Sequence, residues 1–125
     1  MKKILIIDDD RKFRKEYKGR FKSLGFGVLE APDALEVVNL LMREHTNIEL
    51  IILDINIPEV DGRGIYEIIQ EYAPEIPVVV SSVFPISDQK LKIQRARGYH
   101  NKADGKDVLI KKVKEILTTG TSGVR

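Results

Sequence analysis

Three carboxylates are the residues best placed to do chemistry in this 125-residue sequence. Asp8 and Asp9 follow the apolar run 4–7, and Asp54 follows the apolar run 50–53. Clustered carboxylates repel one another, so they are stable together only if they are protonated, paired with cations or bound to a metal. Oxygen ligands alone favour Mg²⁺, and a carboxylate beside Mg²⁺ can attack a phosphoryl group to form an acyl phosphate. The pattern therefore indicates a magnesium-dependent phosphoacceptor site.

A hydroxyl group and an ammonium group follow two later runs. Ser82 comes at the end of the run that starts at Val78, and Lys102 comes directly after residues 99–101. A lysine, like the metal, can stabilise negative charge on transferring phosphoryl oxygens. A serine hydroxyl can donate a hydrogen bond to one of these oxygens once the phosphoryl group is in place.

The elements that must position these residues alternate along the chain. Continuous apolar runs predict five strands, at 4–7, 26–30, 50–53, 78–80 and 99–101. Apolar residues at helical spacing predict five helices, which include 11–24 and 87–97. Such alternation predicts a parallel sheet covered by helices on both faces. Sites in these sheets form beyond the carboxyl ends of the strands, which is where the polar residues fall.

Two of the helices are predicted to bury particular residues against the sheet. The helix that begins at Pro32–Asp33 would turn inward Leu35, Val38, Leu41 and Met42. The helix that follows Gly62 would turn inward Ile65, Ile68, Ile69 and Tyr72. Both sets follow from helical periodicity alone.

Each polar residue also has an ordinary structural interpretation. The aspartates after the first run could cap the helix at 11–24, although we expect Asp10 to be that cap. Asp54 could be a turn residue, Ser82 a strand-end hydroxyl bonded to the backbone, and Lys102 a solvated surface lysine. The joint placement of these residues at strand ends is what favours a site.

The composition is that of one globular domain, with 42% hydrophobic and 32% charged residues. We expect the domain to span 1–119, followed by a flexible polar tail at 120–125. The absence of cysteine excludes disulfides, thiol catalysis and cysteine-based metal sites. No apolar stretch is long enough for a membrane span, and no signal peptide is recognisable. A cytoplasmic location without membrane contact is therefore expected.

The predicted first helix is strongly basic. Its positive residues are Arg11, Lys12, Arg14, Lys15, Lys18, Arg20 and Lys22. A nucleic-acid contact is one interpretation, but no nucleic-acid-binding motif accompanies the helix, and the net charge of the chain is only +2. We favour a solvated helix face and expect no direct nucleic-acid contact, while docking of an acidic protein surface stays open.

Four segments resemble one known family, the receiver domains of response regulators in two-component signalling. Residues 3–10 (KILIIDDD) resemble the opening of these domains, and residues 53–62 (LDINIPEVDG) resemble their phosphoacceptor loop. Residues 76–82 (IPVVVSS) and 98–102 (GYHNK) resemble their fourth and fifth strands. The resemblance covers about residues 2–117. It implies a flavodoxin-like, doubly wound sheet of five parallel strands in the order 2-1-3-4-5, with five helices.

The resemblance also implies roles for individual residues. Asp54 would be the phosphorylated residue. Asp9 would bind Mg²⁺ directly, Asp8 would bind it directly or through water, and Asn56 would offer its backbone carbonyl. Ser82 and Lys102 would contact the phosphoryl group, and Tyr99 would be the switch aromatic that turns inward as Ser82 moves. The implied partners are a sensor histidine kinase or phosphotransfer protein and a downstream output protein or domain.

Three residues depart from the family pattern. Val83 stands where the family usually has a small residue, and it could narrow the mouth of the site. Phe84 follows where many members are polar, and we hypothesise that it shields the acyl phosphate from water. Ala103 replaces the usual proline after the lysine. A cis bond before a non-proline residue costs about 3 kcal/mol, so a trans bond here is expected, which would bear on the placement of Lys102.

Two other functions compete with a phosphorylation-dependent switch. The chain could be a pseudo-receiver, an interaction module that works without phosphorylation, and Val83 and Ala103 give this hypothesis some weight. It could also be an enzyme with an aspartyl nucleophile, but no substrate pocket or general acid is recognisable. We expect a phosphoacceptor that assists its own phosphorylation and dephosphorylation, and not an enzyme that acts on a separate substrate.

Overall fold

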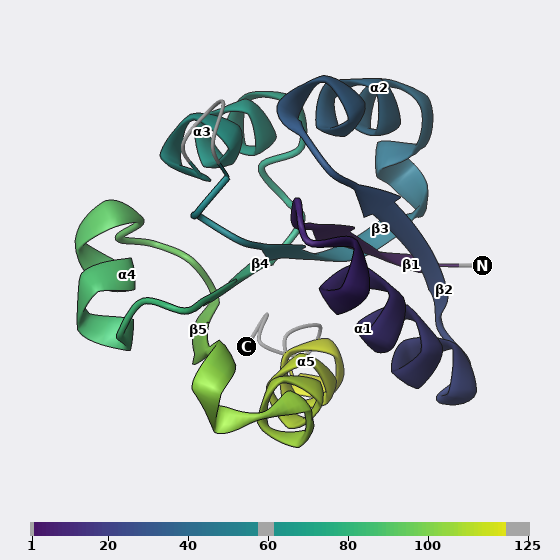
Figure 1. The fold of residues 1–125 in the computed structure, drawn as a ribbon. Helices are drawn as coiled ribbons and strands as arrows, with labels where there is room; N and C mark the ends of the chain where they lie inside the picture. Colours follow the sequence, from purple (N-terminus) through teal and green to yellow (C-terminus); the bar gives the residue numbers. More distant parts are fainter. Residues whose placement is uncertain (1, 58–61, 120–125) are drawn as a thin grey trace.

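A computed structural model describes residues 2–57 and 62–119 of the chain. Its five strands form one parallel sheet in the order β2-β1-β3-β4-β5 (Figure 1). The strands are β1 (Lys3–Ile7), β2 (Gly27–Ala31), β3 (Ile48–Leu53), β4 (Val78–Ser82) and β5 (Gly98–Asn101). The helices are α1 (Arg11–Ser23), α2 (Ala34–Glu44), α3 (Gly62–Tyr72), α4 (Ile86–Lys92) and α5 (Lys106–Thr119). The predicted flavodoxin-like, doubly wound sheet is therefore confirmed.

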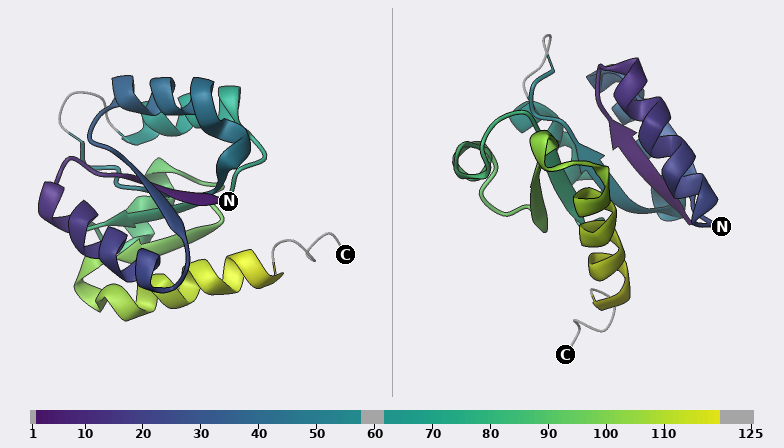
Figure 2. Two further views of the ribbon diagram at one scale, coloured as in Figure 1. Left: turned by 90° about the vertical axis from the view of Figure 1, so that its right-hand side faces the viewer. Right: turned by 60° about the horizontal axis from the view of Figure 1, so that its bottom comes forward.

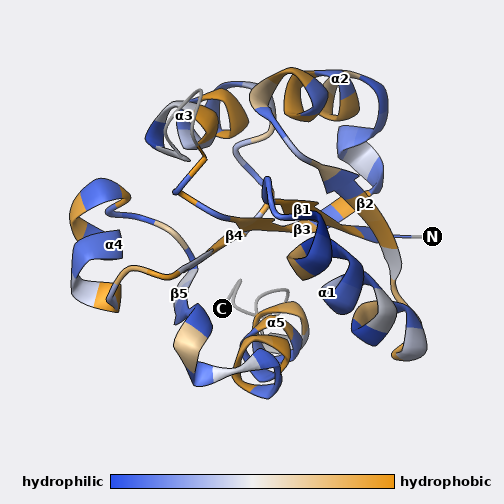
Figure 3. Cartoon of the chain, viewed as in Figure 1, coloured by the Kyte–Doolittle hydropathy of each residue, from blue (hydrophilic) through white to orange (hydrophobic). Residues whose placement is uncertain are grey.

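The helices lie on both faces of the sheet. In Figures 1 and 2, α1 and α5 cover one face, α2 and α3 cover the other, and α4 lies beside the β4–β5 edge. Each face has its own hydrophobic cluster. One is built from the inner sides of α2 and α3, and the other from Tyr17 and Phe21 of α1 with Leu109, Ile110 and Val113 of α5. The central strands are accordingly the most hydrophobic part of the chain (Figure 3), because neither of their faces meets water.

Local signals set the helix boundaries. Asp10 caps α1, since its side chain accepts hydrogen bonds from the backbone N–H groups of Lys12 and Phe13 at 2.9 and 3.3 Å, as predicted. Gly25 follows α1 with φ of 95°, and Gly105 precedes α5 with φ of 93°. The helix predicted at 87–97 is shorter than expected. It ends at Lys92 because the next residue, Ile93, adopts an extended backbone and buries its side chain.

Two predicted helix faces are partly wrong. In α2, Leu35 is 72% exposed and Met42 is 68% exposed, and in α3, Tyr72 is 49% exposed. Leu41 is buried as predicted, and the other residues that α2 buries are Val37 and Leu40. The sequence of α2 carries two overlapping apolar stripes, each at helical spacing, so periodicity could not decide between them. Contact with the sheet selects the stripe that includes Val37.

None of the helices in the described part of the chain is both long and apolar enough to cross a membrane. The predicted tail at 120–125 lies outside the described residues, as does the part of the phosphoacceptor loop at 58–61. The domain boundary at residue 119 therefore stays a prediction.

Candidate functional site

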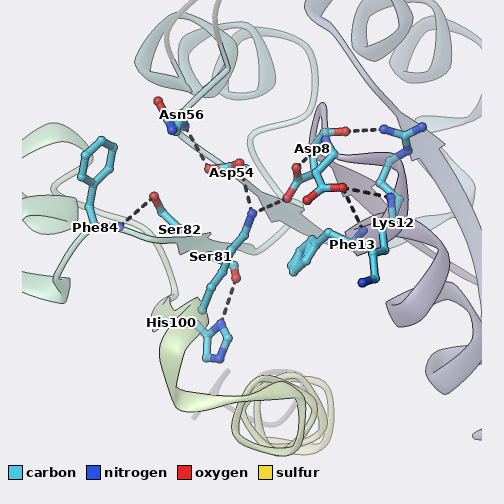
Figure 4. A network of polar contacts seen from close by, with 12 residues as sticks. Asp8, Lys12, Phe13, Asp54, Asn56, Ser81, Ser82, Phe84 and His100 are labelled. Atoms are coloured by element: carbon cyan, nitrogen blue, oxygen red, sulfur yellow. Dashed lines mark hydrogen bonds and ion pairs between the residues drawn. The ribbon is translucent and has the colours of Figure 1, made fainter.

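Four strand ends bring the predicted site residues together at one edge of the sheet. Asp8 and Asp9 follow β1, Asp54 follows β3, Ser82 ends β4, and Lys102 follows β5. Figure 4 shows Asp8 and Asp54 side by side, with Ser82 on the neighbouring strand. One carboxylate oxygen from each of Asp8, Asp9 and Asp54 lies within 4.8 Å of the others. This set of hard oxygen donors fits Mg²⁺.

Backbone groups fix the orientation of the two buried carboxylates. Asp8 is 1% exposed and Asp54 is 5% exposed. The N–H of Asp10 donates to Oδ1 of Asp8 at 2.8 Å, and the N–H of Asn56 donates to Oδ1 of Asp54 at 2.9 Å. The N–H of Asp54 in turn donates to the carbonyl of Ile7 at 2.9 Å, which joins the two strand ends. One oxygen of each carboxylate is therefore tied to its own loop, and the second is turned to Lys102.

Lys102 joins both carboxylates. Its Nζ lies 2.7 Å from Oδ2 of Asp8 and 3.2 Å from Oδ2 of Asp54. Burial alone lowers the pKa of Lys102, but the hydrogen bond to Asp8 and the charges of Asp54 and Asp8 outweigh it, so the pKa is raised. None of the peptide bonds among the described residues is cis, so the bond before Ala103 is trans, as expected. The trans bond does not displace the lysine, which lies beside both carboxylates.

The charge of Asp8 is costly in this position. Burial raises the pKa of Asp8 from 3.8 to about 6. The hydrogen bonds from Lys102 and from the Asp10 N–H lower it only in part, and the charge of Asp54 raises it further. A cation in addition to Lys102 would therefore stabilise the ionised cluster.

Arg14 is a site residue that the sequence did not single out. Its Nη1 donates to the backbone carbonyl of Asp8 at 2.7 Å, and its Nε donates to Glu30 of β2 at 3.0 Å. Lys18 lies 3.3 Å from the same carboxylate. Burial alone would raise the pKa of Glu30, but these two cations lower it. The interpretation of α1 as a solvated basic face fits its exposed residues, such as Lys12 and Lys15, but not Arg14, which anchors the β1–α1 loop.

The two predicted switch residues are held by local hydrogen bonds. Ser82 is fully buried, and its Oγ accepts a hydrogen bond from the N–H of Phe84 at 3.3 Å. The hydroxyl of Tyr99 donates to the carbonyl of Ile93 and accepts from the N–H of Ala96 at 3.2 Å. Phe84 packs partly against the core. Tyr99 is therefore held against the loop between α4 and β5, and the movement of both residues on phosphorylation stays a prediction.

A buried polar network beneath the site was not predicted from the sequence. Oγ of Ser81 lies 2.8 Å from Nδ1 of His100, and Nε2 of His100 lies 2.9 Å from the carbonyl of Gly105. Because a carbonyl only accepts, Nε2 carries the proton and Nδ1 accepts from Ser81. Burial lowers the pKa of His100, which favours this neutral form. The Nε2 group of Gln89 donates to the carbonyls of Phe84 and His100 at 2.8 and 2.9 Å and thereby links α4 to β5.

The loop after Asp54 is anchored by packing. Ile55 and Ile57 are buried, and the N–H of Gly62 donates to the carbonyl of Ile55 at 3.2 Å. A Cβ at Gly62 would lie 2.2 Å from Cα of Ile55, so only glycine fits this approach. The predicted contribution of the Asn56 carbonyl to a metal is not tested by these contacts.

Comparison with known proteins agrees with the fold. The family model of the response regulator receiver domain matches residues 4–116. The chain is similar to a probable transcriptional regulator ycf27 of Porphyridium aerugineum, with 30% identity over 87 residues, which are 70% of this chain and 35% of that protein. The chain spans about a third of the length of such curated relatives.

Solved structures give the same result over almost the whole chain. The N-terminal domain of a response regulator/sensory box/GGDEF 3-domain protein from Carboxydothermus hydrogenoformans has 28% identity and a TM-score of 0.85, with 99% and 100% of the two chains covered. The response regulator TrrA of Thermotoga maritima, solved in complex with Mg(2+)-BeF, has 25% identity and a TM-score of 0.81, with 93% and 99% covered. This chain therefore belongs to the response regulator receiver domain family.

Proposed function

We propose that this domain is a phosphorylation-dependent switch in a two-component pathway and that Asp54 accepts the phosphoryl group. The observation that carries the proposal is the convergence of Lys102 on both Asp8 and Asp54 beside the exposed Asp9. A carboxylate nucleophile, acidic metal ligands and a cation for the transferring oxygens are the parts that aspartyl phosphorylation needs.

Mg²⁺ would be held by Asp8, Asp9, Asp54 and the backbone carbonyl of Asn56, and when bound it would neutralise charge on the phosphoryl oxygens. Support for this ion comes from the oxygen-only cluster and from the magnesium complex of the related TrrA. Asp8 and Asp54 are pre-oriented for the role, because each keeps one oxygen fixed by a backbone N–H. The metal would therefore meet a site that needs little rearrangement.

The transfer itself uses few groups of the chain. An oxygen of Asp54 attacks the phosphorus of a phosphohistidine in a kinase or phosphotransfer protein. The O–P bond forms as the P–N bond breaks, and the electron pair of that bond stays on the imidazole. Lys102 already lies 3.2 Å from Asp54, so it can pair with the phosphoryl oxygens without a large movement. The domain is a phosphoacceptor in this scheme, and it turns over no separate substrate.

The switch depends on Ser82 and Tyr99. Oγ of Ser82 must turn from the N–H of Phe84 toward the phosphoryl group. This movement would change the conformation of the β4–α4 loop. Tyr99 must release the carbonyl of Ile93 and the N–H of Ala96 to turn inward. Phosphorylation would then shift a pre-existing equilibrium of these loops. The altered surface near α4 and β5 would be recognised in the cytoplasm by an output protein or domain.

The deciding experiment is intact-mass analysis after incubation with a small acyl-phosphate donor, with and without Mg²⁺. Wild type should gain one phosphoryl group only with Mg²⁺, and Asp54→Asn should gain none. Asp88→Asn is the matched control, since it removes an exposed carboxylate of α4, and it should be labelled like wild type. A wild-type protein that binds no Mg²⁺ and takes no label from either the donor or a histidine kinase would overturn the proposal in favour of a pseudo-receiver.

A further inference from the structure

The ring of Phe13 faces the ammonium group of Lys102. Nζ of Lys102 lies 4.0 Å from the centroid of the Phe13 ring, within the range of a cation–π contact. The described residues contain two other such contacts, at 5.6 Å for Lys90 with Tyr99 and 5.9 Å for Lys92 with Phe84, and both of those lysines are exposed. The side chain of Lys102 is only 19% exposed, and cation–π contacts are stronger where water is excluded.

The protein holds the Phe13 ring in place from two sides. The backbone N–H of Phe13 donates to the cap residue Asp10, which fixes the first turn of α1. The ring packs against Tyr17 with a centroid separation of 4.5 Å, and the stack continues through Phe21 to Phe26 at 6.2 and 5.9 Å. Tyr17 and Phe21 are buried, so the middle of the stack is anchored in the core. The ring therefore offers a fixed surface to Lys102, and Figure 4 shows it close to Asp8.

The ring differs chemically from the other partners of Lys102. Asp8 and Asp54 are also the oxygen donors that suit a divalent cation, so such a cation competes for their oxygens and repels the ammonium group. An uncharged aromatic face binds an ammonium group and offers no hard oxygen donor to Mg²⁺. The contact with Phe13 should therefore persist when a metal weakens the contacts with the carboxylates.

We propose that Phe13 is a positioning residue for Lys102, which keeps the ammonium group at the site while the carboxylate oxygens are engaged by the metal. The inference rests on the proposed phosphoryl transfer and deepens it. Without the ring, Lys102 would spend more time turned toward solvent, and fewer encounters would find it aligned with the transferring oxygens.

The test compares Phe13→Leu and Phe13→Trp with the control Phe26→Leu, which removes the same ring from the far end of the same stack. With a small acyl-phosphate donor at saturating Mg²⁺, Phe13→Leu should slow phosphorylation by about three- to fivefold, the factor expected for an ordinary cation–π contact. Phe13→Trp should restore the rate to within about twofold of wild type, because indole is the strongest aromatic partner for cations. The affinity for Mg²⁺ should change little in any of the three variants.

A second readout needs no phosphorylation. In the Mg²⁺-saturated protein, NMR should place the terminal methylene protons of Lys102 upfield through the ring current of Phe13. This shift should be lost in Phe13→Leu and kept in Phe26→Leu. If the wild-type protein takes no phosphoryl label but shows the upfield NMR shift, the proposed function is refuted and the contact between Phe13 and Lys102 is not. An absent upfield shift in the Mg²⁺-saturated wild type, a rate for Phe13→Leu equal to wild type, or equal slowing in Phe26→Leu would overturn the positioning role.

Discussion

Replacing Asp8 with asparagine should stabilise the metal-free domain. Burial raises the pKa of Asp8 from 3.8 to about 6, so the ionised form is less stable in the folded state than in the unfolded state. Each pKa unit corresponds to about 1.4 kcal/mol, which gives a cost of about 3 kcal/mol at pH 7. The asparagine would keep the shape of the side chain and an acceptor oxygen for the N–H of Asp10 while it removes the charge. Its amide nitrogen would take the place of Oδ2, so Lys102 would keep only Asp54 as a carboxylate partner. Asp8→Asn should therefore raise the free energy of unfolding by up to about this amount.

The pH dependence follows from the same raised pKa. Between pH 4 and pH 6 the folded state holds a proton on Asp8 that the unfolded state has released, so the contribution of Asp8 to stability falls as pH rises. Below pH 4 both states are protonated, and the contribution vanishes. In metal-free buffer the advantage of Asp8→Asn over wild type should thus be small at pH 4 and reach up to about 3 kcal/mol at pH 7.

Urea unfolding with a metal chelator at several pH values measures this difference. Glu71→Gln is the matched control, because it removes one carboxylate from an exposed position of α3 and should leave stability within about 0.5 kcal/mol of wild type. The reasoning fails if Asp8→Asn is no more stable than wild type at pH 7. It also fails if the gain is the same at pH 4 and pH 7, since a gain with any cause other than removal of the charge would not follow the titration of Asp8.

Three other changes test separate features. Mg²⁺ at about 100 times its Kd should raise the unfolding free energy of wild type by about 2.7 kcal/mol and that of Asp8→Asn by far less, as urea titrations would measure. Gly62→Ala should destabilise the fold by about 2 kcal/mol or more, because the new Cβ would lie 2.2 Å from Cα of Ile55. In the control Gly19→Ala the new Cβ has open space, so this variant should be neutral or stabilising. Ser81→Ala should lower the free energy of unfolding by about 1–3 kcal/mol, measured by thermal or urea unfolding, because it leaves the buried Nδ1 of His100 unpaired. The control Ser23→Ala changes an exposed serine and should lower it less. Equal losses in the two variants would contradict the role of the buried pair.

The strands and the sheet could be predicted from the sequence because continuous apolar runs have few alternatives. The run at 50–53 suits a strand covered on both faces, and the neighbouring helical segments leave room only for parallel pairing. The rotation of the helices was harder to predict. The stripes that contain Leu35 and Val37 in α2 are equally apolar, and the difference between them exists only in contact with the sheet.

The candidate site residues that the structure brings together share one property, which is their place at the end of a strand. In a parallel sheet that place fixes their position to within a few ångströms, so Asp8, Asp54 and Lys102 could be brought together without coordinates. The alanine after Lys102 does not move the lysine away from the predicted edge of the sheet. The lysine is positioned by the register of β5 against β4 and by its charge partners, and not by the bond that follows it.

The residues that were not predicted make contacts between different elements. These contacts depend on side-chain rotamers, which strand order does not specify. Arg14 and Phe13 come from the first turn of α1. A helical wheel of this segment does not distinguish Arg14 from the other basic residues, or Phe13 from the aromatic residues that pack in the core. Their contacts with the β1–α1 loop and with Lys102 depend on how α1 lies against the sheet. The pair Ser81 and His100 left a usable signal, because buried polar side chains must find partners. Applied to β4 and β5, that rule would have paired the two residues, since their strands are neighbours and the residues lie in register.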